Sequence, residues 1–224
     1  DGIMAFPEIY VNGHLAGTWD YGYNSFYLDI TDYVQFDREN VLAIHVDTRP
    51  HDSRWYPGAG IYRKVQMITV DPAHVGIWGT HVTTPIVKPH SADVRVMTTV
   101  RNTDAHQMDA LKMVQVIVNP DGREIAREEI PVTIASGTDR KVETTFTLTD
   151  PRRWDIEDPA LYALQTFIYK NNEEVDRSTT NFGIRTMRFT ANHGFYLNDR
   201  RVQLKGVNLH HDHGPLGAAF YPRA

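Results

Sequence analysis

The segment ADVRVMTTV at residues 92–100 alternates apolar and polar side chains over most of its length, and it decides the fold class. Successive side chains of a strand point to opposite faces, so this period of two predicts a strand with one dry face. The segment IYRKVQMITV at residues 61–70 alternates in the same way and predicts another strand. Val, Ile, Thr and Tyr are abundant in both segments and suit a pleated surface. Because no stretch of roughly 12 residues has convincing helical periodicity, the sequence predicts a mainly β protein.

Turn residues separate the predicted strands. Asn12-Gly13 favours a type I′ hairpin because both residues tolerate a positive φ. The run at 119–122 (NPDG) and the pair Asn171-Asn172 also lie between alternating runs. Asn198-Asp199 reads as a further hairpin-like turn. Repeated short strands with such turns predict antiparallel sandwiches.

Two composition breaks, at Asp71-Pro72 and at FGIR (182–185), predict three domains. Residues 73–185 have the size of an immunoglobulin-like β-sandwich, about 110 residues. Residues 1–72 hold fewer strands than a full jelly roll, so we expect an N-terminally incomplete one. In residues 186–224, an apolar strand is predicted over 204–209. A barrel of eight strand–helix units takes about 250 residues, so only its first strand fits here.

The composition excludes several classes of function. The formal net charge is −5 and the basic residues are scattered, so we expect no nucleic acid partner. No apolar run approaches the length of a membrane span, so we expect no membrane partner. The chain has no Cys, which excludes disulfides, thiolate nucleophiles and Cys-ligated zinc. The N-terminal residues show no secretory pattern, which leaves the periplasm and the cytoplasm of a bacterium both open.

A loop rich in Gly and aromatic residues, SRWYPGAGIYR at 53–63, is the first candidate site. Sugars present hydroxyls for hydrogen bonds and C–H faces for stacking. Arg54 beside Trp55 and Tyr56 on a rigid loop therefore suits sugar binding. The alternative is a sandwich-edge loop in which Trp55 caps the core and Arg54 pairs with a carboxylate.

The polar segment GVNLHHDH at 206–213 is the second candidate site, because it directly follows the predicted strand at 204–209. The active sites of TIM barrels lie at the C-terminal ends of their strands, so these side chains could contact a substrate. A second reading is a metal site, since His211 and His213 have the spacing of imidazole zinc ligands. A third reading is a solvated polar loop.

Two acidic pairs look catalytic but are better explained as surface charge. Glycosidases need paired carboxylates, and Glu173-Glu174 follows an Asn. This pair lies at a polar turn between two predicted strands, however, so we expect a solvated hairpin tip. Glu128-Glu129 is interpreted as charge along a strand edge.

Taken in order, these segments resemble glycoside hydrolase family 2, which includes bacterial β-galactosidases, β-glucuronidases and β-mannosidases. IYVNG (9–13), DITDY (29–33) and ENVLA (39–43) resemble the family's sugar-binding jelly roll, and SRWYPGAGIYRKV (53–65) resembles its closing loop and last strand. Arg153-Trp154, Asp158-Pro159, Leu161-Tyr162 and FGIR resemble the end of its immunoglobulin-like domain. LNDRRVQLKGVNLHHDHGPLG (197–217) resembles the start of its TIM barrel.

The resemblance implies retaining hydrolysis of a β-glycoside by two Glu residues, one as acid and one as nucleophile. Both belong to barrel positions beyond Ala224, so we expect no catalytic residue here and an inactive isolated fragment. The Trp-Tyr-Pro-Gly loop resembles that of β-galactosidases more than that of β-glucuronidases, so we expect a β-galactosidase, with β-glucuronidase or β-mannosidase as the alternatives. The rivals from other classes are a non-catalytic carbohydrate-binding module and a metal-dependent hydrolase.

The resemblance implies four candidate substrate-binding residues, of which two match sugar-contacting positions of the family and two lie near such positions. His210 matches a His that contacts the glycone in β-galactosidases, and Asp212 matches an Asp that does so in β-glucuronidases. Asn208 lies beside them. Arg54 falls near an acidic residue that contacts sugar and sodium in some β-galactosidases, but Arg cannot ligate a cation. We therefore expect no metal site or cofactor in this chain; a divalent cation or sodium would belong to the complete enzyme. The expected partner is a carbohydrate substrate, with a homo-oligomer for the complete enzyme.

Overall fold

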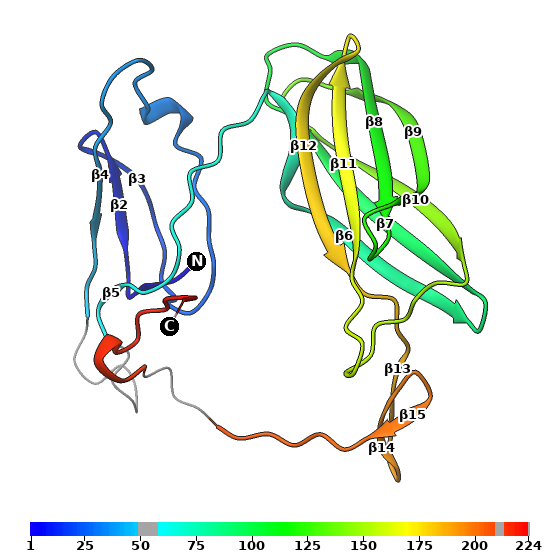
Figure 1. Ribbon diagram of the computed structural model, residues 1–224. Coiled ribbons are helices and arrows are strands. Elements are labelled where there is room, and N and C mark those ends of the chain that lie inside the picture. The colour runs from blue at the N-terminus through cyan, green and yellow to red at the C-terminus, as the bar shows by residue number, and fades with distance from the viewer. Residues whose placement is uncertain (49–57, 209–212, 224) are drawn as a thin grey trace. The chain divides into compact units, whose positions relative to one another are not determined.

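The computed structural model describes residues 1–48, 58–208 and 213–223, and these residues form strands and two short 3₁₀ turns (Figure 1). They divide into two compact units, residues 1–68 with 206–224, and residues 69–205. The mainly β fold that the sequence predicts is confirmed. None of the described helical segments has the length or apolarity that crossing a membrane requires.

The unit of residues 69–205 is built on a sandwich of two antiparallel sheets (Figure 1). One sheet has the order β10-β7-β6 and the other has the order β12-β11-β8-β9. The strands are β6 (Ala73–Lys88), β7 (Ser91–Asn102), β8 (Met108–Val118), β9 (Glu124–Ile134), β10 (Asp139–Thr149), β11 (Tyr162–Lys170) and β12 (Glu173–Phe182). Three and four strands in two facing sheets is the arrangement of a small immunoglobulin-like sandwich.

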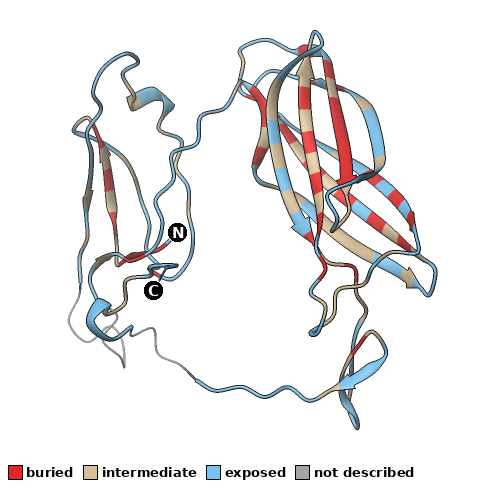
Figure 2. Cartoon of the chain, in the orientation of Figure 1, coloured by how far each residue is buried: buried red, intermediate tan, exposed pale blue. Residues whose placement is uncertain are grey.

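The alternation at 92–100 becomes the buried face of β7, as predicted. Ala92, Val94, Val96, Thr98 and Val100 are all buried, whereas the residues between them are partly or fully exposed. Buried and less buried residues also alternate along much of β10 and along β11, whereas β8 is buried almost continuously over its second half (Figure 2). Two apolar clusters fill the interior. The first includes Val94, Val96, Ile117, Phe146 and Leu164, and the second includes Val100, Met113, Val132, Ile134 and Ile168.

A buried polar group links the two sheets. Gln115 of β8 is fully buried, and its Nε2 donates to the hydroxyl of Thr98 in β7 at 2.9 Å. The hydroxyl of Thr144 in β10 donates to Gln115 Oε1. A buried amide must be hydrogen-bonded to avoid a large desolvation cost. These two bonds therefore favour one alignment of the four-stranded sheet over the three-stranded sheet.

A third, small sheet follows the sandwich. It has the order β13-β14-β15, with β13 at Met187–Thr190, β14 at Gly194–Leu197 and β15 at Arg200–Val202. The predicted turn at Asn198-Asp199 joins β14 to β15, with φ of 48° and 63°. Asn171-Asn172 joins β11 to β12 with φ of 54° and 66°. Both turns are confirmed, and Glu173-Glu174 begins β12 at an exposed hairpin tip, also as predicted.

The unit of residues 1–68 with 206–224 contains a three-stranded sheet, β3-β2-β4, and a two-stranded sheet, β1-β5. The strands are β1 (Ile3–Met4), β2 (Glu8–Val11), β3 (His14–Thr18), β4 (Leu42–His45) and β5 (Gly60–Ile61). The predicted Asn12-Gly13 turn joins β2 to β3, and both residues have positive φ. The Asn12 side chain also donates to Tyr33 O at 2.8 Å and accepts from Val41 N–H at 3.0 Å.

Two predicted strands are wrong in extent. Of residues 61–70 only Ile61 is in a strand, as the second residue of the pair Gly60–Ile61, whose partner β1 is also two residues long. Residues 62–70 lie outside every described sheet, and Met67 and Ile68 are exposed. Likewise, residues 204–208 form no strand, and Leu204 and Val207 are exposed. An alternating or apolar sequence permits a strand, but a strand forms only where another segment supplies hydrogen-bond partners.

We predict that Gln115→Met destabilises the sandwich by about 1–3 kcal/mol, because the buried hydroxyl of Thr144 loses its acceptor. Replacing all three partners, as Gln115→Met with Thr98→Val and Thr144→Val, should recover most of this loss, since no polar group is then left unsatisfied. Urea unfolding monitored by circular dichroism measures both. The control is Thr145→Val, which changes an exposed residue next to Thr144 in β10. A triple variant less stable than Gln115→Met would contradict the prediction.

Candidate functional site

Of the four predicted sugar-contacting residues, Asn208 is described and is exposed. Arg54, His210 and Asp212 lie outside the described residues, as do Trp55 and Tyr56. Their predicted roles stay predictions. The end of the first candidate segment, from Gly58 on, and the residues after the second candidate segment are described.

The end of the first candidate segment is fixed by Tyr62. Gly58 and Gly60 have φ of 69° and 98°, values that favour glycine. Tyr62 is buried, and its hydroxyl donates to Gly22 O at 2.9 Å. Burial is the main cause that raises the pKa of this hydroxyl, so it stays protonated and can donate. Tyr62 is therefore a structural anchor at the described end of this segment.

The residues after the second candidate segment return to this anchor. A short 3₁₀ turn, η2 (Gly214–Leu216), reverses the chain, and His213 N–H donates to Gly217 O at 2.8 Å. Phe220 N–H then donates to Tyr62 O at 2.9 Å. A Cβ placed on Gly58 would lie 3.5 Å from Ala218 Cβ. The end of the first candidate segment and the residues that follow the second, although about 160 positions apart in sequence, therefore lie against each other.

In the sandwich unit, the segment after β10 is packed against the segment after β12. Trp154 N–H donates to Ile184 O at 2.9 Å. A Cβ on Gly183 would lie 2.9 Å from Trp154 Cβ, so only glycine fits beside the indole side chain. The guanidinium of Arg185 lies 5.2 Å from the centre of the Trp154 ring, a cation–π distance. Trp154 is thus packed with Gly183, Ile184 and Arg185.

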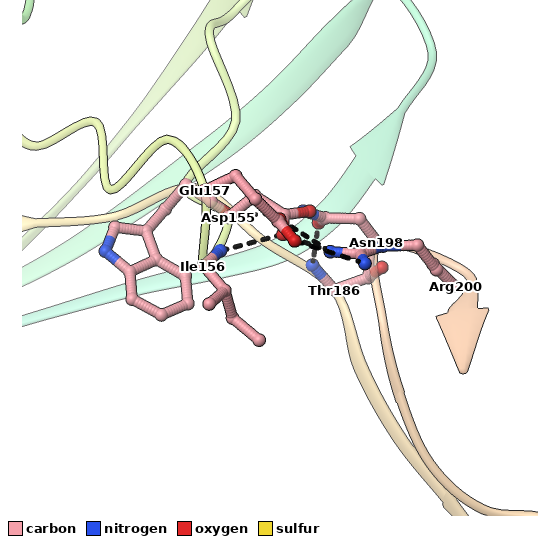
Figure 3. Close-up of polar contacts among 7 residues, drawn as sticks. Asp155, Ile156, Glu157, Thr186, Asn198 and Arg200 are labelled. Atoms are coloured by element: carbon pink, nitrogen blue, oxygen red, sulfur yellow. Dashed lines mark hydrogen bonds and ion pairs between the residues drawn. The ribbon is translucent and has the colours of Figure 1, made fainter. Parts of the chain in front are cut away.

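Asn198 ties the third sheet to this group (Figure 3). Its Nδ2 donates to Trp154 O at 2.9 Å and to an Asp155 carboxylate oxygen at 3.1 Å. Its Oδ1 accepts from Thr186 N–H at 3.1 Å. All the polar atoms of this amide therefore have partners. The sequence identified Asn198 only as a turn residue, and the side-chain role is new.

Arg200 adds ion pairs to the same place (Figure 3). Its guanidinium lies 2.7 Å from Asp155 and 2.8 Å from Glu157. The pKa of Asp155 is lowered to about 2, first by the hydrogen bond from Asn198, then by the backbone N–H of Ile156, with Arg200 a smaller contribution. We call the side chains of Asp155, Glu157, Asn198 and Arg200 the hairpin clamp.

A polar hollow of the sandwich also has a structural explanation. A hollow of about 570 Å³ is lined by Arg101, Asn102, Thr103, Gly137 and Asp139. Arg101 and Asp139 are paired through two hydrogen bonds, and Asn102 donates to carbonyl groups of its own sandwich. Among the described residues, no group of three His, Asp or Glu side chains could hold a metal ion.

Comparisons with known proteins agree with one another. The family model described as glycosyl hydrolases family 2 matches residues 75–185. The whole chain is 40% identical to 26% of a beta-galactosidase, BoGH2A, of Bacteroides ovatus, and 27% identical to 33% of a beta-glucuronidase of Bacteroides fragilis. It also superposes on 29% of a family 2 glycosyl hydrolase structure from Bacteroides cellulosilyticus, with a TM-score of 0.90 and 34% identity. The chain thus spans about a quarter to a third of these relatives' lengths.

We predict that Asn198→Gly raises the pKa of Asp155 from about 2 toward its ordinary value of 3.8, and by more than Arg200→Gln does. Asn198 is the largest cause of the shift, and Gly keeps the positive φ of the turn. A lowered carboxyl pKa stabilises the folded state above about pH 4 and stops doing so as the pH falls toward 2. Titration of the Asp155 carboxyl carbon by NMR measures both shifts. A larger shift in Arg200→Gln would reverse the assignment.

Proposed function

The chain belongs to family 2 of the glycosyl hydrolases, and from this premise we propose that it supplies the sugar-binding and scaffold parts of a retaining β-glycosidase. The observation that carries the proposal is the contact between Phe220 and Tyr62. It joins the residues that follow the HHDH segment to those that follow the SRWYPG segment, the two stretches that we interpret as sugar-contacting.

In this proposal the chain has three parts. Residues 1–72 are a partial sugar-binding jelly roll, residues 73–185 are the immunoglobulin-like sandwich, and residues 186–224 begin the catalytic barrel. His210, Asp212 and Asn208 bind hydroxyl groups of the glycone, with Arg54 beside them. Their side chains supply the donors and acceptors that a sugar needs.

The catalytic acid and nucleophile would lie beyond Ala224. Retaining glycosidases hold two carboxyl groups about 5–5.5 Å apart around the scissile bond. The acidic pairs of the sandwich do not suit this role, since Glu129 is bound by Lys112 and Glu174 by Arg177. Both carboxylates are at least partly exposed on strands of a structural domain. We therefore propose that this chain binds and positions sugar but does not cleave it.

The proposed glycone is β-galactose. The support is the similarity to the Bacteroides ovatus beta-galactosidase over the whole chain. A β-glucuronide is the second candidate, because the chain is also similar over its whole length to beta-glucuronidases, including a Bacteroides uniformis structure with a TM-score of 0.90. We further propose that the complete enzyme is a homo-oligomer.

Assays with aryl β-galactoside, β-glucuronide and β-mannoside test the proposal. We expect the 224-residue chain to turn over none of them, and a longer gene product that includes the barrel to prefer the galactoside. Turnover by the chain that is lost on mutating one of its own Glu residues would overturn the proposal. A long form that binds sugar without cleaving it would instead indicate a carbohydrate-binding module. Activity that depends on added zinc would indicate the metal-dependent hydrolase.

In the longer form, His210→Ala should lower kcat and raise KM, with a combined loss of roughly 2–4 kcal/mol in transition-state stabilisation, as for one catalytic hydrogen-bond donor. Asp212→Asn should cost less than Asp212→Ala, because the amide oxygen still accepts a hydrogen bond. Steady-state kinetics and the affinity for a galactose-like inhibitor measure these effects. His81→Ala, a change on sandwich strand β6, is the matched control. Wild-type kinetics in His210→Ala would remove His210 from the site.

A further inference from the structure

A layer of polar side chains crosses the interior of the sandwich between its two apolar clusters. On β11, Thr166 lies between Leu164 of the first cluster and Ile168 of the second. Thr98 on β7 and Gln115 on β8 occupy the same place between the clusters on their own strands. The side chains that we call the polar layer come one from each of six strands, and they are Thr80, Thr98, Gln115, Thr144, Thr166 and Ser178.

The strand register brings five of these side chains to one level of the interior. Directly paired residues of an antiparallel pair point to the same face of their sheet. In the four-stranded sheet, Thr166 pairs with Gln115 on one side and with Ser178 on the other. In the three-stranded sheet, Thr80 pairs with Thr98. The hydrogen bond from Gln115 to Thr98 joins these two rows across the interior.

A bulge in β6 places Thr80 in this layer. The register of β6 against β7 shifts between Val75 and Thr80, so the intervening residues bulge out and Thr80 takes the next inward position after Val75. Val75 N–H donates to the carboxylate of Asp176 in β12 at 2.7 Å, which holds this part of β6 against β12. Thr80 therefore lies toward the strand that carries Ser178.

The two halves of the polar layer differ in their hydrogen bonds. Gln115 is bonded to two other members of the layer. The hydroxyl oxygens of Thr80, Thr166 and Ser178 are buried, and they have no hydrogen-bond partner among the described residues. Thr166 as a whole is only 1% exposed. Because a buried hydroxyl without a hydrogen bond is costly, buried hydroxyls in native proteins are bonded to protein or to ordered water.

We propose that the polar layer binds a buried water molecule, which bridges Thr166 to Thr80 and Ser178. A hydroxyl can donate one hydrogen bond and accept two, so three hydroxyls suit a ligand that both donates and accepts. Buried waters typically make about three hydrogen bonds to polar groups that lack other partners. The layer has no charged side chain, so an ion bound there would not be neutralised.

The water bridge complements the contacts of Gln115. Gln115 joins β8 to β7 and β10, and the bridge joins β11 and β12 to β6. Six of the seven sandwich strands are then connected through one hydrogen-bonded layer, which favours a single alignment of the two sheets. All the residues involved belong to the sandwich unit, and the inference does not rest on the proposed function.

The first test is Thr166→Val, which replaces the hydroxyl by a methyl group. A hydroxyl bonded to water contributes a hydrogen bond, so we expect its loss to raise the equilibrium constant for unfolding of the sandwich unit on the order of fivefold. A hydroxyl without any partner has the opposite effect, because its removal ends a desolvation cost. An unchanged or smaller unfolding constant in Thr166→Val would therefore overturn the proposal.

Native-state hydrogen exchange of the β8 and β11 amides measures this constant. Both are inner strands of the four-stranded sheet, so their slowest amides report the unfolding of the sandwich unit. The matched control is Thr179→Val, which changes an exposed residue next to Ser178 in β12 and should leave the exchange rates unchanged.

The second test is a high-resolution crystal structure of the chain and of Thr166→Ser, which keeps the hydroxyl if Thr166→Val does not fold. In both we expect an ordered water within hydrogen-bond distance of the hydroxyl at position 166 and of at least one of Thr80 and Ser178. Hydroxyls that bond directly to one another or to strand carbonyls, with no water between them, would overturn the proposal. Neither test depends on glycosidase activity, so a failure of the proposed function leaves both decisive.

Discussion

The burial of side chains between two facing sheets is the constraint on which the sandwich unit depends. Each strand can offer one face to the interior, so the alternation of β7 fixes which residues meet Ile117 and Leu164 across the gap. Gln115 makes this alignment specific, since its amide can be satisfied only when Thr98 and Thr144 stand opposite it. A shifted sheet would leave a buried amide without partners, at a cost comparable to a whole hydrogen bond.

The hairpin clamp is built on this rigid base. Ile184 is fully buried in the first apolar cluster, and it accepts the hydrogen bond from Trp154 that places the 154–157 segment. Asp155 and Glu157 are then presented to Asn198 and Arg200. The buried Ile184 thus positions Trp154 through a main-chain hydrogen bond, and Trp154 O in turn accepts from the Asn198 side chain. Asn198 lies in the turn that leads into β15.

The residue types of the candidate site could be read from the sequence. The residues that hold the neighbouring segments in place could not. The segments at 53–63 and 206–213 stand out because aromatic, Arg, His and Asp side chains gather beside Gly and Pro. Tyr62 carries no such signal, because a buried anchor and a sugar-stacking ring are the same residue type in sequence. Asn198 was visible as a turn residue, but its amide partners lie 12 and more than 40 positions away along the chain. Local sequence holds no information about such partners.

The sequence by itself determined the β class, the hairpin turns and the dry face of residues 92–100, because strand alternation and positive φ are properties of neighbouring residues. The tertiary structure decided which alternating segments became strands. Residues 92–100 lie between β6 and β10, which satisfy the N–H and C=O groups on both edges. Residues 62–70 belong to no described sheet, and the main-chain hydrogen bonds described for them are confined to Tyr62 and Lys64. It also decided that Phe220 meets Tyr62 and that Asn198 meets Asp155. Such pairings depend on where the folded chain brings distant backbone and side-chain groups within hydrogen-bond distance.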